Sequence, residues 1–170
     1  MDNLTARIIE LSTGVYVIPA NTNVGVITNE REGIVEVYLV DSGCTEIDGE
    51  YVLDVLKAFF EQMGQNFTLK AVILTHGHAD HCGACNFLKE ETYCQIWVAK
   101  PEQGAMENTI IQSAALWGGY PPHEMRTLFF MPQNTFVDSF ISPETVIELS
   151  GERKISSPLN FKTPIRFTIA

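Results

Sequence analysis

The sequence predicts an α/β fold, and three observations lead to that class. The first forty residues carry short β-branched runs separated by turn residues, as in "ARIIELSTGVYVIP". From about residue 48 onward, segments with helical periodicity alternate with short apolar runs. A length of 170 residues with 45% hydrophobic residues fits one folded domain with its own core.

The first strands are predicted within residues 6–19, 23–29 and 33–43. The earliest segment breaks into two strands at Ser12, Thr13 and Gly14, and "NEREG" is the turn before the last one. This last run, "GIVEVYLVDSG", delivers Asp41 at its carboxyl end, directly before Ser42 and Gly43.

A helix follows, with Asp48 as its predicted N-cap and Gly64 at its end. Its apolar residues recur at helical spacing: Val52, Val55, Leu56, Phe59 and Met63. The next run, "LKAVILT", is apolar on both faces, which is typical of a buried strand.

Later elements continue the alternation. We expect a helix from about Asp80 to Glu91, a strand at "QIWVA" and a helix from Pro101 to about Trp117. "GGYPPHE" ends that helix, and a further strand is predicted at Thr145 to Leu149.

The loop after the buried strand, "LTHGHADHCG", holds three of the four histidines of the chain. His76 and His78 are two residues apart, so in an extended segment both imidazoles project to the same side. Asp80 and His81 follow where a helix would begin. Imidazole suits zinc, and carboxylate adds a harder donor. These four residues predict a metal site for one ion or two close ions; a coincidental polar loop is the alternative.

The string "THGHADHCGA" resembles the signature loop of the metallo-β-lactamase superfamily, and "VYLVDSG" is similar to the family's preceding strand. The order of elements from about Val15 to Leu149 is similar as well. The resemblance implies an αββα sandwich with the active site at one edge, between two sheets. It also implies zinc as the cofactor, one ion or two, with iron or manganese as alternatives.

By the same resemblance, His76 and His78 would bind a first metal ion, and Asp80 and His81 a second. Asp80 would also be catalytic, because the family's aspartate orients the metal-bound water. The implied function is hydrolysis of a small-molecule ester, thioester, lactam or phosphodiester. Asp41 would support the loop from behind the ligands, or would be an ordinary turn residue.

The family completes its site with ligands from a second half of the fold, which this sequence does not match. The only later histidine is His123, which we interpret as a surface residue. We therefore divide the chain into residues 1–152, the N-terminal part of such a domain, and residues 153–170, a divergent basic tail.

The tail differs in charge, since all 21 acidic residues precede Arg153 and four of the 11 basic residues follow Glu152. It suggests a chain cut short or read out of frame, or else a genuine variant terminus. An incomplete fold would leave one face of the sheet uncovered. Because the family's later ligands are missing, a non-catalytic family member with weak or no metal binding is the alternative function, and a homo-oligomer that shares donors is a third.

Composition limits the partners and the compartment. The net charge of −10 argues against nucleic acid, and no apolar run approaches the roughly 20 residues of a membrane helix. The N-terminus has no signal-peptide pattern, and four cysteines are too few for a disulfide scaffold, so we expect a cytoplasmic protein. Cys82 and Cys85 are interpreted as core residues; a Cys/His zinc site is the alternative.

Overall fold

The computed structural model describes residues 7–127, 131–142, 145–149, 153–156 and 168–169. The larger sheet contains β1 (Ile9–Ser12), β2 (Val15–Ile18), β3 (Val24–Arg31), β4 (Ile34–Val40), β5 (Phe67–Ile73), β6 (Gln95–Ala99) and β7 (Ser139–Ile141). The smaller sheet contains β8 (Val146–Glu148), β9 (Lys154–Ser156) and β10 (Thr168–Ile169). The helices are α1 (Glu46–Gln62), α2 (Ala79–Cys82), α3 (Cys85–Thr92), α4 (Gln103–Glu107) and α5 (Ile110–Trp117), with 3₁₀ turns η2 (Lys100–Glu102) and η3 (His123–Met125).

The larger sheet has seven strands in the order of the chain, β1 to β7. The strands β1 to β4 pair antiparallel, whereas β4, β5, β6 and β7 pair parallel. The parallel part requires crossover connections, which α1 and α3 supply. The predicted alternation of strands and helices is therefore confirmed.

Both faces of this sheet are covered, so its central strands are apolar on both sides. Val37 and Leu39 of β4 face the core on the helix side, whereas Tyr38 belongs to a second apolar cluster on the opposite side. In β5 the register shifts by one residue at Lys70, which is why Leu69 and Val72 share a face. "LKAVILT" thus forms a buried strand, as its composition predicts.

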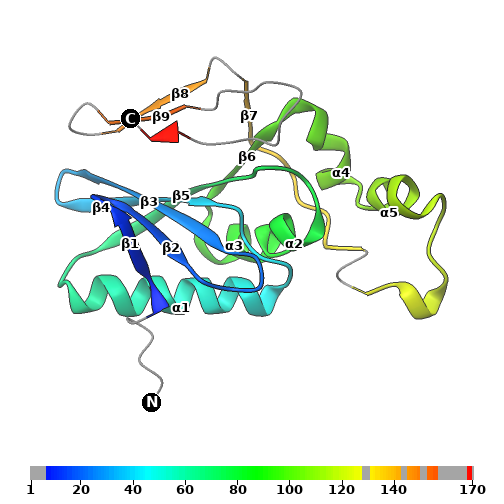
Figure 1. Ribbon diagram of the computed structural model, residues 1–170, viewed down its shortest axis with the longest axis horizontal. Helices are drawn as coiled ribbons and strands as arrows, with labels where there is room; N and C mark the ends of the chain where they lie inside the picture. The colour runs from blue at the N-terminus through cyan, green and yellow to red at the C-terminus, as the bar shows by residue number, and fades with distance from the viewer. Residues whose placement is uncertain (1–6, 128–130, 143–144, 150–152, 157–167, 170) are drawn as a thin grey trace.

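The helix layer lies beneath the seven-stranded sheet, with α1 and α3 packed on each other (Figure 1). Close approach is possible because Gly49 of α1 has no side chain; a Cβ there would lie 2.6 Å from the Phe87 ring. The predicted N-cap of α1 is wrong by three residues. Thr45 is the N-cap, and Asp48 occupies the third helical position of a capping box, where its carboxylate accepts from the Thr45 N–H.

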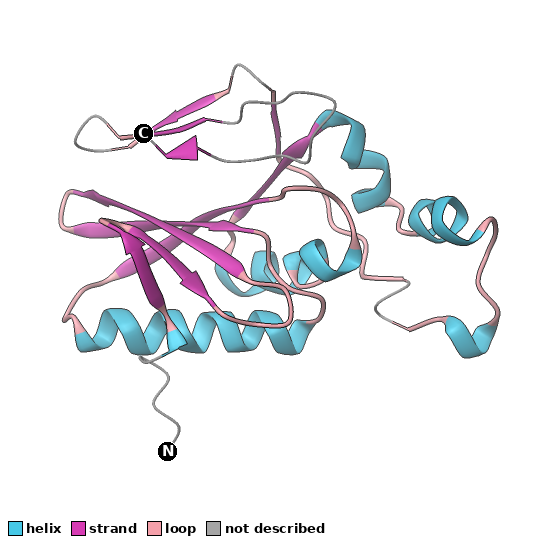
Figure 2. Cartoon of the chain, viewed as in Figure 1, coloured by secondary structure: helices cyan, strands magenta, loops and turns pink. Residues whose placement is uncertain are grey.

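The three-stranded antiparallel sheet lies over the opposite face of the larger sheet, completing a layered arrangement of helices, sheet and sheet (Figures 1 and 2). Ile155 of β9 and Leu149 are buried against Ile27, Tyr38 and Ile73 of the larger sheet. The expectation of an uncovered face is therefore wrong for this part of the sheet. The proposed tail, residues 153–170, contributes β9 to this layer, and residues 157–167 and 170 lie outside the described residues.

Two predicted helices are interrupted. The segment 80–91 divides into α2 and α3 at Gly83 and Ala84, and the segment 101–117 divides into η2, α4 and α5. Asn108 leaves the helical conformation at φ −142° and ψ 83°, and Thr109 donates to the side chain of Asn134. β7, which the sequence pattern does not predict, adds an edge strand beside β6.

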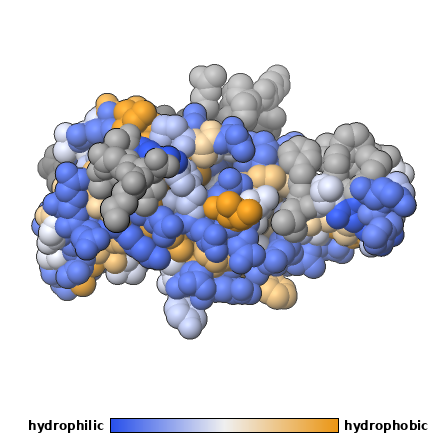
Figure 3. Space-filling view, turned by 90° about the horizontal axis from the view of Figure 1, so that it is seen from below, coloured by the Kyte–Doolittle hydropathy of each residue, from blue (hydrophilic) through white to orange (hydrophobic). Residues whose placement is uncertain are grey.

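The described helices are all too short or too polar to cross a membrane. The face of the molecule shown in Figure 3 is mostly hydrophilic, with small separate apolar patches.

Candidate metal centre

The histidine loop begins where β5 ends, at the carboxyl edge of the parallel strands. Asp41 follows β4 at the same edge, since parallel neighbours end side by side. The Asp41 N–H donates to the Ile73 carbonyl at 3.1 Å, and the Leu74 N–H donates to the Trp97 carbonyl at 2.9 Å. The sheet thus brings the two sequence motifs together although they are separated by α1.

Asp41 supports the loop through its carboxylate. It is 5% exposed and adopts a left-handed conformation with φ 64°, which aspartate tolerates better than most residues. Its Oδ1 accepts from the Thr75 N–H at 2.8 Å, and Oδ2 lies 2.8 Å from Nδ1 of His81. The ordinary-turn alternative is therefore wrong: the side chain holds both ends of the loop.

The three imidazoles of the loop lie against one another. The ring centroids of His76 and His78 are 4.6 Å apart, and those of His76 and His81 are 4.0 Å apart. Burial and the neighbouring imidazoles lower the pKa of His76, which favours the neutral ring that binds metals.

Hydrogen bonding also assigns the tautomer of His76. The Thr75 hydroxyl lies 2.9 Å from both Asp41 oxygens, and since a carboxylate only accepts, the hydroxyl donates to it. The Thr75 oxygen can then accept from Nδ1–H of His76 at 3.0 Å. This leaves the Nε2 lone pair of His76 free to bind a cation.

His81 lies between two carboxylates. Its Nδ1 contacts Asp41 at 2.8 Å, and its Nε2 lies 3.4 Å from Oδ2 of Asp80. A cation bound at Nε2 would therefore have the Asp80 carboxylate as a neighbouring donor, while Asp41 orients the ring from the other side. The donor set of three imidazoles and one carboxylate therefore fits a borderline cation such as zinc in its chemistry.

The four predicted site residues do come together on one loop, but they do not form a closed cage. Within the described ranges, no group of three or more His, Cys, Asp and Glu side chains is arranged to hold one metal ion. His123 lies in η3 and is exposed, in agreement with its interpretation as a surface residue.

The backbone behind the loop is closely packed. The N–H and hydroxyl of Ser42 both donate to the His81 carbonyl, at 2.8 and 2.9 Å. A Cβ at Gly83 would lie 1.8 Å from the Cys44 carbonyl oxygen, so only glycine fits there. Gly83 therefore allows α2 to dock on the segment after β4.

The cysteines near the loop are core residues, as predicted. Cys82, Cys85 and Cys94 are buried free thiols within the helix-side core. Burial raises the pKa of Cys82 to about 12 and that of Cys85 well above its ordinary value. Their Sγ atoms donate to the Gly77 carbonyl and the Ser42 hydroxyl, and the described His, Cys, Asp and Glu side chains form no group of three or more that could hold an ion, which argues against the Cys/His zinc alternative.

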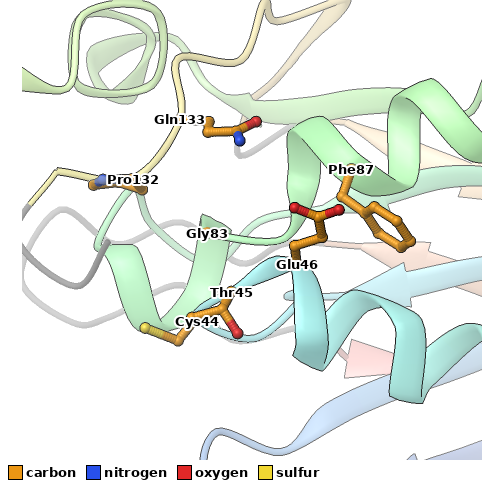
Figure 4. A pocket seen from close by; sticks show the side chains of 7 residues that line it. All are labelled: Cys44, Thr45, Glu46, Gly83, Phe87, Pro132 and Gln133. Atoms are coloured by element: carbon orange, nitrogen blue, oxygen red, sulfur yellow. The ribbon is translucent and has the colours of Figure 1, made fainter. Parts of the chain in front are cut away.

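A small pocket lies beside the loop, between the start of α1, the junction of α2 and α3, and the segment around Gln133 (Figure 4). It is lined by Cys44, Thr45, Glu46, Gly83, Phe87, Pro132 and Gln133. No member of the histidine loop before Gly83 lines it, so this pocket is separate from the candidate metal ligands.

Sequence patterns miss three residues that contact the loop. Besides Ser42, they are Glu102 and Gln112, which hydrogen-bond to Gly77 from η2 and α5. The short Asp-Ser-Gly motif is a signal that could identify Ser42, because it ends a strand at the same sheet edge. The other two lie 25 and 35 residues after Gly77 in unremarkable helical segments.

The family model of the metallo-beta-lactamase superfamily matches residues 17–154, and the chain belongs to this superfamily. Among curated proteins, the "Probable metallo-hydrolase YflN" of Bacillus subtilis (strain 168) is 36% identical over 64 residues, which are 38% of this chain and 23% of that protein.

Solved structures show the same fold. A metallo-beta-lactamase motif mutant from Cronobacter sakazakii superposes with a TM-score of 0.67 at 16% identity, over 89% of this chain and 53% of its own. A beta-lactamase from Chitinophaga pinensis gives 0.65 at 19% identity, over 92% and 54%. BJP-1, a subclass B3 metallo-beta-lactamase of Bradyrhizobium japonicum, gives 0.62 at 17% identity, over 92% and 53%. The chain thus spans about half the length of these structures.

Proposed function

We propose that this chain carries the metal-binding half of a metal-dependent hydrolase site, with zinc as the cofactor. The observation that carries the proposal is the cluster of three imidazoles and the Asp80 carboxylate on one loop, fixed from behind by Asp41. Membership of the metallo-beta-lactamase superfamily supports it.

In this proposal His76 and His78 bind one ion, and Asp80 and His81 bind a second or share the first. When bound, the metal would lower the pKa of a water molecule toward neutrality and polarise a substrate oxygen. The protein's own contribution is positional. Asp41 accepts from Nδ1 of His81 and so directs Nε2 toward Asp80, and Thr75 orients the ring of His76 in the same way.

Asp80 is the proposed catalytic residue. Its carboxylate is partly exposed and adjoins Nε2 of His81, so it can accept a hydrogen bond from a nucleophilic water while remaining near the ligands. The substrate would be a small ester, thioester, lactam or phosphodiester. Four free thiols agree with a reducing compartment, so we also propose a cytoplasmic location.

A second candidate function is a family member that binds metal weakly and does not catalyse. One observation favours it: the described His, Cys, Asp and Glu side chains form no group of three or more that could hold one metal ion. A homo-oligomer that shares donors between subunits is the third.

Metal binding by the purified chain separates these functions. We expect zinc at one or two ions per chain, measured by elemental mass spectrometry after dialysis at neutral pH, with turnover of at least one of the four substrate classes. A His76→Ala, His78→Ala double variant should lose both. His123→Ala, which removes the exposed histidine of η3, is the matched control and should lose neither. Wild-type protein without zinc or turnover would support the second candidate and contradict the first.

A further inference from the structure

Gly77 separates the two histidines of the first proposed ligand pair, and side chains from later elements hold both of its peptide groups. Its N–H donates to Oε2 of Glu102 at 3.0 Å. Its carbonyl oxygen accepts from Nε2 of Gln112. One of these peptide planes continues into His76 and the other into His78, so both planes next to the ligands are fixed.

The approach of Glu102 depends on the missing side chain of Gly77. Gly77 is buried, and a Cβ at this position would lie 3.2 Å from Oε2 of Glu102 and 3.4 Å from Cβ of Ala105. A larger residue would have to displace the carboxylate. Since the carboxylate is charged, its hydrogen bond to the backbone is stronger than one between neutral groups.

Gln112 of α5 is a buried polar side chain with 5% exposure. A buried amide needs a hydrogen-bond partner, and the Gly77 carbonyl is that partner. The same carbonyl accepts from the Cys82 thiol at 3.4 Å, but a thiol is a weak donor. Gln112 is therefore the main group that fixes this carbonyl.

We infer that Glu102 and Gln112 are positioning residues for the His76 and His78 pair. They clamp Gly77 from two sides and so set the direction of both imidazoles. The segment from η2 to α5 thereby controls how tightly the loop binds a cation. The effect on cation binding rests on the proposed function, whereas the two hydrogen bonds to Gly77, here called the clamp, are present in the metal-free protein.

Three variants of the full chain test the clamp. Glu102→Ala removes the acceptor, Gln112→Met removes the donor at similar volume, and Glu102→Gln retains an oxygen acceptor without the charge. Gln103→Met is the matched control, because Gln103 bonds to Glu107 within α4 and does not touch Gly77. If Gln112→Met does not fold, Glu102→Ala carries the test, since its side chain is only half-buried.

In the metal-free protein, we expect faster amide hydrogen exchange at Gly77 in Glu102→Ala, which removes the acceptor of that N–H, and shifted ring resonances of His76 and His78 in both Glu102→Ala and Gln112→Met. In zinc competition with a chromophoric chelator, the same variants should bind roughly tenfold more weakly. Glu102→Gln should remain within about threefold of wild type, because it keeps the hydrogen bond. Gln103→Met should match wild type in all three measurements.

Unchanged exchange in Glu102→Ala and unchanged ring resonances in both variants would overturn the inference. So would equal loss of zinc affinity in Gln103→Met, because the effect would then be one of general stability. If wild-type protein binds no zinc, the proposed function fails, and the exchange and ring measurements on the metal-free protein alone decide the clamp.

Discussion

Asp41 joins the ends of two strands through a single buried carboxylate. Three donors converge on it: the N–H and hydroxyl of Thr75 and Nδ1 of His81. Each buried donor left without a partner costs about 1–3 kcal/mol. The carboxylate therefore stabilises the fold as well as the arrangement of the proposed ligands.

We expect Asp41→Ala to lower the free energy of unfolding by roughly 3 kcal/mol. It leaves the donors of Thr75 and His81 without their acceptor, and it places alanine at a positive φ. Asp41→Asn should lose only about 1 kcal/mol, since its amide oxygen still accepts from Thr75 and asparagine tolerates this conformation. Urea denaturation of the metal-free protein measures both. Equal losses in the two variants would show that the hydrogen bonds to Oδ1 and Oδ2 are not what stabilises the loop.

The buried thiols of Cys82 and Cys85 predict a loss of stability at alkaline pH. Their folded-state pKa values are raised, to about 12 for Cys82, whereas unfolded thiols ionise near pH 9. Stability is fully present below pH 9 and falls as the pH rises above it, because only the unfolded chain releases these protons. Each thiol adds a slope of roughly 1.4 kcal/mol per pH unit between pH 9 and its folded pKa.

Denaturation series between pH 8 and pH 10.5 test this slope. A Cys82→Ala, Cys85→Ala variant should show a shallower decline than wild type. Cys44→Ala is the control, since Cys44 is only half-buried and should change the slope less. Parallel pH profiles for wild type and the double variant would contradict the assigned burial of the two thiols.

The four proposed ligands could be predicted from sequence because they lie on one short segment, where spacing alone brings side chains together. The supporting role of Asp41 follows from the sequence only through the resemblance to the superfamily, and the structure gives its physical reason, since the parallel strands β4 and β5 end at a common edge. Glu102 and Gln112 could not be predicted, since their contact with Gly77 depends on how η2 and α5 return to the loop. Hydrophobic periodicity describes which face of a helix is buried, not which polar residue on it meets a distant backbone group.

At the scale of elements, tertiary contacts interrupt helices that periodicity alone predicts as continuous. The helix predicted from Asp80 breaks where Gly83 meets the Cys44 carbonyl, and the helix predicted from Pro101 breaks where Thr109 bonds to Asn134. In both places the helix is interrupted where it lies close against another segment of the chain. Such contacts are not visible in the local sequence.

The start of α1 is an element whose stability can be tested directly. Oδ2 of Asp48 accepts from the N–H groups of Cys44 and Thr45, whereas the Thr45 hydroxyl accepts from one N–H. We expect Thr45→Ala to cost about 1 kcal/mol, and Asp48→Ala to cost more, roughly 2 kcal/mol, because it leaves two donors without a partner.

Thermal or urea unfolding measures the two losses. Asp54→Ala is the control, because Asp54 lies on the exposed side of α1 and makes only a 4.0 Å ion pair with Lys57. It should cost less than 0.5 kcal/mol or so. A larger loss of stability in Thr45→Ala than in Asp48→Ala would contradict this prediction. It would mean that the Thr45 hydroxyl, and not the Asp48 carboxylate, contributes most to the stability of the N-terminus of α1.

At the scale of the whole molecule, the core consists of two apolar clusters, one on each face of the seven-stranded sheet, and each joins different elements. The helix-side cluster contains most of the large buried side chains and fixes the sheet edge from which the histidine loop emerges. The opposite cluster is smaller and joins the seven-stranded sheet to the strands after Ser142. Leu74 and Cys82, which flank the histidine loop, both belong to the helix-side cluster, so this cluster anchors the two ends of the loop.

The boundary predicted at residue 152 gives the last test. Beyond it, Arg153 donates to the carbonyl oxygens of Thr13 and Thr28, and Ile155 is 1% exposed in the second cluster. If β9 is an integral layer, Ile155→Ala should lower the free energy of unfolding by about 2–5 kcal/mol, as in an ordinary core.

Ile47→Ala is the matched control, because Ile47 is 74% exposed on α1 and the same truncation there should cost about 0.5 kcal/mol or less. A cost for Ile155→Ala as small as that of Ile47→Ala would mean that residues after 152 contribute nothing to the core, as expected for a separate basic tail. A large cost, unfolding in one transition with the rest of the chain, would place β9 inside the domain and move its boundary past Ser156.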